Sequence, residues 1–308
     1  MSASSEPSRG LPADFSVAEK DCALYEGVRY EEYWGDPAQV RQNALEKHLV
    51  REMLPPRGHR IIDVGCGYGR LAPCYLDRFD SVVLYDGSMS LLSQARDSMG
   101  DRAILVAGDV MRLPFKTASF DNVLSIRVLQ HMHDLVGAVG GIRRILAKNG
   151  SFLFSYHNKR NAHRVLTYPQ SCRIADPFSL ESAEVSPTLI SHHPERMAAL
   201  LGDVGFSKPE YRGAVIINSV AKLTERLGGR EPSGLSWARI SGRYRLAPWL
   251  IGRVQALEGP GLVKGEDVSD LFECPACRGD VARRDESFEC SECGTRYPII
   301  EGIVDFRL

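Results

Sequence analysis

Short apolar runs alternate with amphipathic segments through the first half of the chain. Five runs have the length and composition of β-strands, namely Arg60–Val64, Ser81–Tyr85, Ala103–Ala107, Phe120–Ile126 and Ser151–Tyr156. The intervening segments with helical spacing are Arg70–Phe79, Ser88–Ser98 and Leu135–Ala147. Strands that alternate with helices pair in parallel through right-handed crossovers. The pattern therefore predicts a doubly wound, mostly parallel α/β sheet.

The flanking segments are less regular. A helical pattern spans Pro37 to Met53, and after Tyr156 the elements expected are a helix over His193–Val204, a strand over Lys208–Ile217 and an apolar run over Ala247–Ala256. We expect a disordered tail at 1–20, an N-terminal helical lid at 21–57 and a main domain at 58–257 with an insertion or lid at 218–246. A linker at 258–269 and a small unit at 270–308 complete the expected organisation.

Composition and charge narrow the class of protein. The chain has 308 residues, with 38 basic and 39 acidic side chains and a net charge of −1. A general nucleic-acid binder usually carries a basic footprint, so that class is disfavoured. The apolar runs of this chain are far shorter than the roughly 18 residues of a membrane span. The segment Met1 to Asp14 is polar, with no apolar core of a secretory signal, and we expect a cytoplasmic protein.

The charge is unevenly distributed along the chain. Residues 270–308 contain nine acidic and five basic side chains, whereas Arg212–Arg253 contains eight basic and two acidic ones. This asymmetry suggests that the C-terminal unit docks on the basic segment. The alternative is that the C-terminal unit recruits a protein partner.

Four of the eight cysteines share a spacing typical of metal ligands. Cys274, Cys277, Cys290 and Cys293 form two C-x2-C pairs separated by twelve residues. Tetrahedral zinc takes four thiolates, and two short C-x2-C turns can each supply a pair. The alternative is a redox dithiol pair or unrelated cysteines. We favour a structural zinc site, because disulfides are rare in the cytosol.

A glycine-rich turn follows the first predicted strand. Its sequence is Asp63-Val64-Gly65-Cys66-Gly67-Tyr68-Gly69-Arg70, a G-x-G-x-G pattern rather than the G-x-G-x-x-G of dinucleotide binders. Glycines let the backbone approach a ligand closely, and amides at the start of a helix favour a carboxylate or phosphate. The acid before the glycines suits a ligand with an ammonium group.

The next two strands also end in acids. Asp86 follows the second strand and can accept both hydroxyls of a ribose, while Asp109 follows the third and can accept from an adenine amine beside the Val110 amide. Each acid alone is more often a helix cap or a turn residue. Three acids at successive strand ends favour a ligand site at one edge of the sheet.

These motifs resemble those of class I S-adenosylmethionine-dependent methyltransferases. Four segments carry the resemblance in order: Ile61–Gly69, Tyr85–Met89, Gly108–Phe115 and Phe120–Ser125. It implies a seven-stranded Rossmann-like sheet, methyltransferase activity and S-adenosylmethionine as cofactor. The cofactor-binding residues that it implies are Asp63, Gly65, Cys66, Gly67, Gly69, Asp86, Gly87, Met89, Asp109, Val110, Arg127 and Tyr33.

The C-terminal unit has a resemblance of its own. The two cysteine pairs, followed by Tyr297-Pro298-Ile299-Ile300-Glu301-Gly302-Ile303, are similar to a Trm112-type zinc ribbon. In that family the ribbon supports or activates methyltransferases, so its presence on this chain is coherent with the first resemblance.

The methyl acceptor is the least defined part. Histidine titrates near neutral pH, and His131 and His157, which follow the fourth and fifth strands, are our first candidates for a general base. The cationic run Asn158–Arg164 favours an acidic small-molecule acceptor. An RNA or protein methyltransferase and a non-catalytic cofactor-binding scaffold are the alternatives. Tyr30, Tyr33 and Trp34 are expected either to cover the cofactor or to anchor the first helix.

Overall fold

The computed structural model describes residues 34, 37–168, 176–214, 234–265 and 267–307. Several sequence predictions fall outside these ranges. They are the tail at 1–20, the lid up to residue 33 with Tyr30 and Tyr33, and the insertion up to residue 233.

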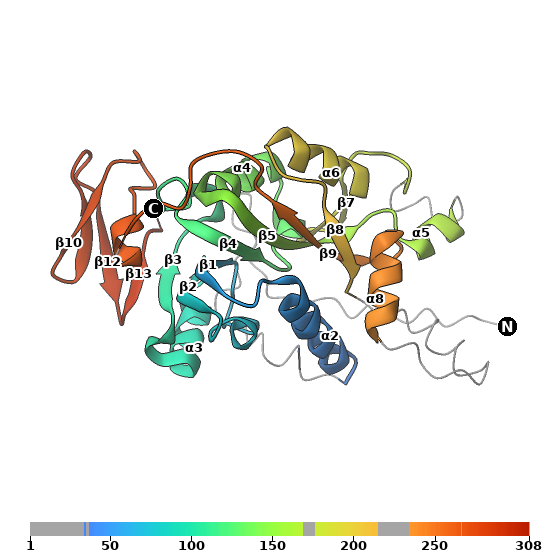
Figure 1. Ribbon diagram of the computed structural model, residues 1–308, viewed down its shortest axis with the longest axis horizontal. Coiled ribbons are helices and arrows are strands. Elements are labelled where there is room, and N and C mark those ends of the chain that lie inside the picture. The colour runs from blue at the N-terminus through green and yellow to red at the C-terminus, as the bar shows by residue number, and fades with distance from the viewer. Residues whose placement is uncertain (1–33, 35–36, 169–175, 215–233, 266, 308) are drawn as a thin grey trace.

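A parallel sheet occupies the centre of the molecule (Figure 1). Its five parallel strands are β1 (Gly58–Val64), β2 (Phe79–Asp86), β3 (Ile104–Ala107), β4 (Phe120–Ser125) and β5 (Leu146–Asn158). Two more strands continue it in antiparallel pairing beyond β5, namely β9 (Trp249–Gln255) and β8 (Glu210–Gly213). The order β3-β2-β1-β4-β5-β9-β8 confirms the predicted doubly wound, seven-stranded core.

Helices cover both faces of this sheet (Figure 1). One face carries α2 (Pro37–Met53), α3 (Met89–Met99) and α8 (Gly234–Arg243), and the other carries α4 (Leu135–Ile145) and α6 (Pro194–Asp203). Adjacent strand residues such as Ile61 and Ile62 belong to opposite cores and are both fully buried. None of the described helices has the length and hydropathy needed to cross a bilayer.

The helix predicted over Arg70–Phe79 is wrong. The structure has a short 3₁₀ helix, η1 (Ala72–Cys74), between tight turns. Pro73 lacks an amide proton, and neighbouring amides bond three residues back, as Cys74 does to Leu71 (2.8 Å) and Tyr75 to Ala72 (3.0 Å). The proline therefore replaces an α-helix with a tighter turn after the glycine segment.

A hairpin that the sequence did not predict extends β5. Its strands are β6 (Ala183–Ser186) and β7 (Leu189–His192), and β7 pairs in parallel with the end of β5, where His157 faces Ser191. The pairing of β4 with β5 stops at Phe154, which leaves this edge of β5 open to β7. The short helix α5 (Ala162–Thr167) follows β5, capped by Asn161.

The C-terminal unit joins the central sheet. Its strands are β10 (Val281–Arg284), β11 (Ser287–Cys290), β12 (Arg296–Ile300) and β13 (Ile303–Asp305), antiparallel to one another. Strand β13 pairs in parallel with β3 and so extends the sheet (Figure 1). Phe272 packs between Phe115 of the segment that joins β3 to β4 (centroids 5.4 Å apart) and Phe288 of the unit (5.1 Å). The unit and the sheet therefore share one core.

The predicted docking of the C-terminal unit on Arg212–Arg253 is wrong for the described part of that segment. The unit lies at the β3 edge, whereas β8 and β9 lie at the opposite side of the seven-stranded core. Arg212 pairs instead with Glu210 (2.8 Å) and Glu52 (3.4 Å), and Arg253 pairs with Glu210 (2.9 Å). Strand pairing and aromatic packing hold the unit at the β3 edge, and its acids Glu273, Asp280 and Glu301 pair there with Arg144, Lys116 and Arg96.

Candidate cofactor site and metal site

The glycine turn leaves β1 with its backbone in the left-handed region. Gly65, Gly67 and Gly69 have φ values of +78°, +56° and +77°, which glycine adopts without steric cost. A Cβ on Gly65 would lie 2.2 Å from Cγ2 of Val128, so this position must be small. A Cβ on Gly67 would meet nothing closer than 3.9 Å. The turn is thus tight against the β4 loop and has free space at its middle glycine.

Asp86 ties this turn to the end of β2. Its carboxylate accepts from the Gly67 amide (2.7 Å) and from the Ser88 amide (2.9 Å). Ser88 caps α3, which places Gly87 and Met89 directly beside the carboxylate. The hydrogen bonds fix the carboxylate at the edge where β1 and β2 end.

The third acid lies at the same edge. Asp109 follows β3 and is exposed, with one carboxylate oxygen bonded to the Met111 amide (2.9 Å), while Val110 is buried behind it. The Tyr85 hydroxyl donates to the Asp109 carbonyl (2.8 Å). Because β1, β2 and β3 pair in parallel, Asp63, Asp86 and Asp109 emerge side by side, as the sequence predicted.

Asp63 is a buried carboxylate near the end of β1. Its side chain accepts a hydrogen bond of 2.5 Å from the Tyr75 hydroxyl. Burial raises the pKa of Asp63 to about 7, although Tyr75 and the charge of Arg70 act in the opposite direction. Burial together with the charges of Asp86 and Asp63 also raises the pKa of the Cys66 thiol, which is therefore neutral. A cationic group of a ligand could therefore pair with the Asp63 carboxylate.

An ion cluster that the sequence did not predict lies beside the glycine turn. Glu46 of α2 is buried and bonds both Arg70 (2.9 Å) and Arg127 (2.5 Å). Burial would raise the pKa of Glu46, but the two guanidinium charges outweigh it and lower the pKa. Trp34 lies under Arg70, 4.0 Å from its ring centre, and Arg127 has a left-handed φ of +63°. These residues are far apart in sequence, which gives no signal of their pairing.

The two candidate bases differ in their surroundings. Both ring nitrogens of His131 have partners, Nδ1 with the Thr188 carbonyl and Nε2 with Gln130 (3.0 Å). His157 packs edge-on against Trp249 (centroids 5.1 Å), and its buried Nδ1 has no hydrogen-bond partner among the described residues. Burial lowers the pKa of each to about 4, assisted at His157 by nearby arginines. Both imidazoles are neutral at physiological pH.

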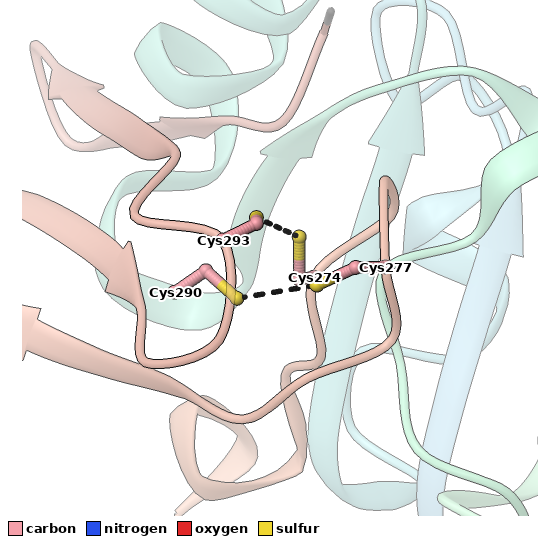
Figure 2. Close-up of side chains that lie close together, drawn as sticks. All are labelled: Cys274, Cys277, Cys290 and Cys293. Atoms are coloured by element: carbon pink, nitrogen blue, oxygen red, sulfur yellow. Dashed lines mark hydrogen bonds between the residues drawn. The ribbon is translucent and has the colours of Figure 1, made fainter.

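The four spaced cysteines form a second site in the C-terminal unit. Figure 2 shows their sulfurs turned toward one another, with Cys274 and Cys293 3.7 Å apart and Cys277 and Cys290 3.4 Å apart. All four sulfurs lie within 4.8 Å of one another. Tetrahedral zinc with bonds of about 2.3 Å separates its sulfurs by about 3.8 Å. The cluster therefore fits a tetrathiolate zinc ion.

Comparison with known proteins identifies the central domain. Residues 62–154 match the family model of a methyltransferase domain. This range contains the glycine turn and all three acids. Over this range the chain is similar to a methyltransferase domain. Its seven-stranded core, with β9 antiparallel between β5 and β8, agrees with this assignment.

Curated relatives match the methyltransferase domain and part of its surroundings. A malonyl-[acyl-carrier protein] O-methyltransferase of Geobacter sulfurreducens is 38% identical over 131 residues, covering 41% of this chain and 48% of the relative. The methyltransferase GfsG of Streptomyces halstedii is 31% identical over 130 residues, covering 38% and 46%. The chain thus spans about half the length of the curated relatives it matches.

Solved structures share the fold of the methyltransferase domain. A SAM-dependent methyltransferase from Thermotoga maritima has a TM-score of 0.51 at 16% identity, covering 74% of this chain and 94% of that one. A chain of the complex between the Haloferax volcanii Trm112 methyltransferase activator and a methyltransferase has a TM-score of 0.52 at 18% identity, covering 78% and 100%. At these identities the likeness concerns the fold.

Proposed function

We propose that the chain is an S-adenosylmethionine-dependent methyltransferase that acts on a small molecule. The observation that carries this proposal is the juxtaposition of a left-handed glycine turn with Asp63, Asp86 and Asp109 at the ends of three adjacent parallel strands. The methyltransferase family match over residues 62–154 supports it, as do relatives named as O-methyltransferases.

The residues at this edge fit the parts of the cofactor. Asp63 is a buried acid suited to the methionine ammonium, and the turn from Gly65 through Cys66 and Gly67 to Gly69 offers amides and space for the carboxylate. Asp86 would hold the ribose hydroxyls, flanked by Gly87 and Met89. Asp109 and Val110 would hold the adenine, and Arg127 would close the pocket near the β4 loop.

The sulfonium supplies an already activated methyl group, so the protein must orient the acceptor and manage its proton. His157 has a free buried Nδ1 among the described residues and is our preferred candidate for that proton. His131 is held on both ring nitrogens and would position the loop after β4. With a pKa of about 4, His157 suits an acceptor that is readily ionised.

We also propose that the C-terminal unit holds structural zinc and is a Trm112-type ribbon. The donor set of four thiolates and the sulfur spacing support zinc. The Tyr297 hydroxyl lies 3.0 Å from the Cys274 sulfur, a neighbour that would orient this ligand. Parallel addition of β13 to β3 supports a role for the ribbon in bracing the methyltransferase domain.

Calorimetry and a methyl-transfer screen test the proposed function. We expect the purified chain to bind S-adenosylmethionine, and Asp86→Ala and Asp109→Ala to weaken that binding. Transfer of a tritiated methyl group to members of a small-molecule collection is the expected activity. Absence of binding would refute the assignment. Binding with transfer only to RNA or protein would replace the acceptor class, and binding without any transfer would favour a scaffold.

A further inference from the structure

A half-buried arginine on α5 has no acidic partner among the described residues. The Arg164 guanidinium donates one hydrogen bond within the described residues, to the Ser191 hydroxyl at 3.3 Å, and no described carboxylate lies within ion-pair distance of it. By contrast, the buried guanidinium groups of Arg70 and Arg127 share Glu46. Burial lowers the pKa of Arg164, which indicates that its charge is poorly solvated. A guanidinium carries five N–H donors, and the described residues accept one hydrogen bond from this one.

The position of Arg164 places it beside the acceptor side of the site. Ser191, which holds the guanidinium, pairs across β7 and β5 with His157. The His157 ring packs on Trp249, and Arg127 lies over the same indole, 4.3 Å from its centre. The charges of Arg164 and Arg127 both act on His157. A series of contacts therefore runs from Arg164 on α5 through Ser191, His157 and Trp249 to Arg127 in the loop after β4.

We propose that Arg164 binds a carboxylate of the methyl acceptor, next to His157 and Trp249. This inference rests on the proposed methyltransferase function and names the class of its substrate. The neighbouring cations Lys159 and Arg127 are less available to a carboxylate, because each already has protein partners. The Lys159 ammonium donates to the carbonyls of Ser179 (3.0 Å) and Glu181 (2.6 Å), and Arg127 is paired with Glu46, which it shares with Arg70.

The shape of the guanidinium favours a carboxylate. The pKa values of the neighbouring imidazoles of His157 and His192 are lowered by burial, so these side chains are neutral and add no charge of their own. A carboxylate matches the planar fork of arginine. Trp249 adds an apolar wall, so these surroundings suit a small acid with an apolar or aromatic body.

Binding of matched acids and amides tests this inference on the full chain. The protein saturated with S-adenosylhomocysteine is titrated with benzoate, with its neutral isostere benzamide and with inorganic phosphate, followed by ligand-observed NMR. We expect benzoate to bind tightest, and Arg164→Gln to weaken it about tenfold or more, the loss of one charge-assisted hydrogen bond. Arg164→Lys should restore part of the affinity. Arg160→Gln, which removes an equal charge nearby, should leave benzoate binding unchanged.

Several outcomes would overturn the inference. They are equal benzoate affinity in Arg164→Gln and the unaltered chain, benzamide binding as tightly as benzoate, and phosphate binding more tightly than both. Unchanged S-adenosylhomocysteine affinity in Arg164→Gln shows that this variant is folded. If the chain does not bind S-adenosylhomocysteine at all, the proposed function fails, while benzoate titration of the ligand-free chain still decides whether Arg164 is a carboxylate site.

Discussion

Replacement of Asp63 by asparagine should stabilise the protein while weakening its cofactor site. The carboxylate is buried with a pKa of about 7, well above its usual 3.8. The folded state therefore holds a proton that the unfolded state has released between pH 4 and pH 7. Its contribution to stability falls as pH rises through this window and is constant above it. Asparagine mimics the neutral acid and removes this dependence.

The size of the effect follows from the pKa. One pKa unit corresponds to about 1.36 kcal/mol. From pH 5 to a pKa of about 7 is two pKa units, so the contribution of Asp63 to the free energy of unfolding should fall by about 3 kcal/mol between pH 5 and pH 8. The difference in unfolding free energy between Asp63→Asn and the unaltered chain should therefore change by about 3 kcal/mol in favour of the variant over the same pH range. The buried histidines titrate identically in both proteins and cancel in the difference.

Urea unfolding at half-unit intervals from pH 5 to pH 8 measures this difference. The matched control is Asp109→Asn, which removes an exposed acid from the same edge of the sheet. The affinity of the unaltered chain for S-adenosylmethionine should fall as pH drops below about 7, because the ammonium needs the ionised acid. Parallel stability profiles for Asp63→Asn and the unaltered chain would refute the reasoning.

Three further perturbations have expected outcomes. Glu46→Gln removes the carboxylate that the buried guanidinium groups of Arg70 and Arg127 share, and should lower the free energy of unfolding in urea by about 3–5 kcal/mol; a loss under 1 kcal/mol would contradict it. Gly65→Ala forces an alanine into the left-handed region against Val128 and should abolish the heat of S-adenosylmethionine binding in calorimetry. Retained binding heat would argue against a role of the glycine turn in holding the cofactor. Chelation should release one zinc per chain and lower the melting temperature, and a chain without zinc would refute the metal site.

The sequence allowed the central strands and the acids of the cofactor edge to be predicted because each depends on local pattern. Strands buried on both faces are short continuous apolar runs, and β1 to β5 begin or end within a few residues of those runs, apart from the earlier start of β5. The prediction of an α-helix after the glycine turn was wrong because Pro73 outweighs an otherwise helical composition. Strands β6 and β7, of four residues each, are too short to show a period.

Contacts between distant segments account for what was missed at the site. Glu46, Arg70 and Arg127 come from three elements, and nothing local indicates that one carboxylate serves two arginines. The same holds for Tyr75, which reaches Asp63 only because the turn containing Pro73 brings it back. Such pairings require the fold before they can be recognised.

The position of the C-terminal unit links its metal site to the cofactor edge. Cysteine spacing predicts four ligands but says nothing about β13, whose partner β3 lies almost 200 residues earlier. After β13 the Phe306 amide bonds the Ala107 carbonyl (2.8 Å), and Arg307 reaches the Gly87 carbonyl (3.5 Å). These contacts brace the backbone next to Asp109 and Asp86. Because the unit and the sheet share the Phe115–Phe272 core, loss of the metal should loosen both of these strand ends rather than the ribbon alone.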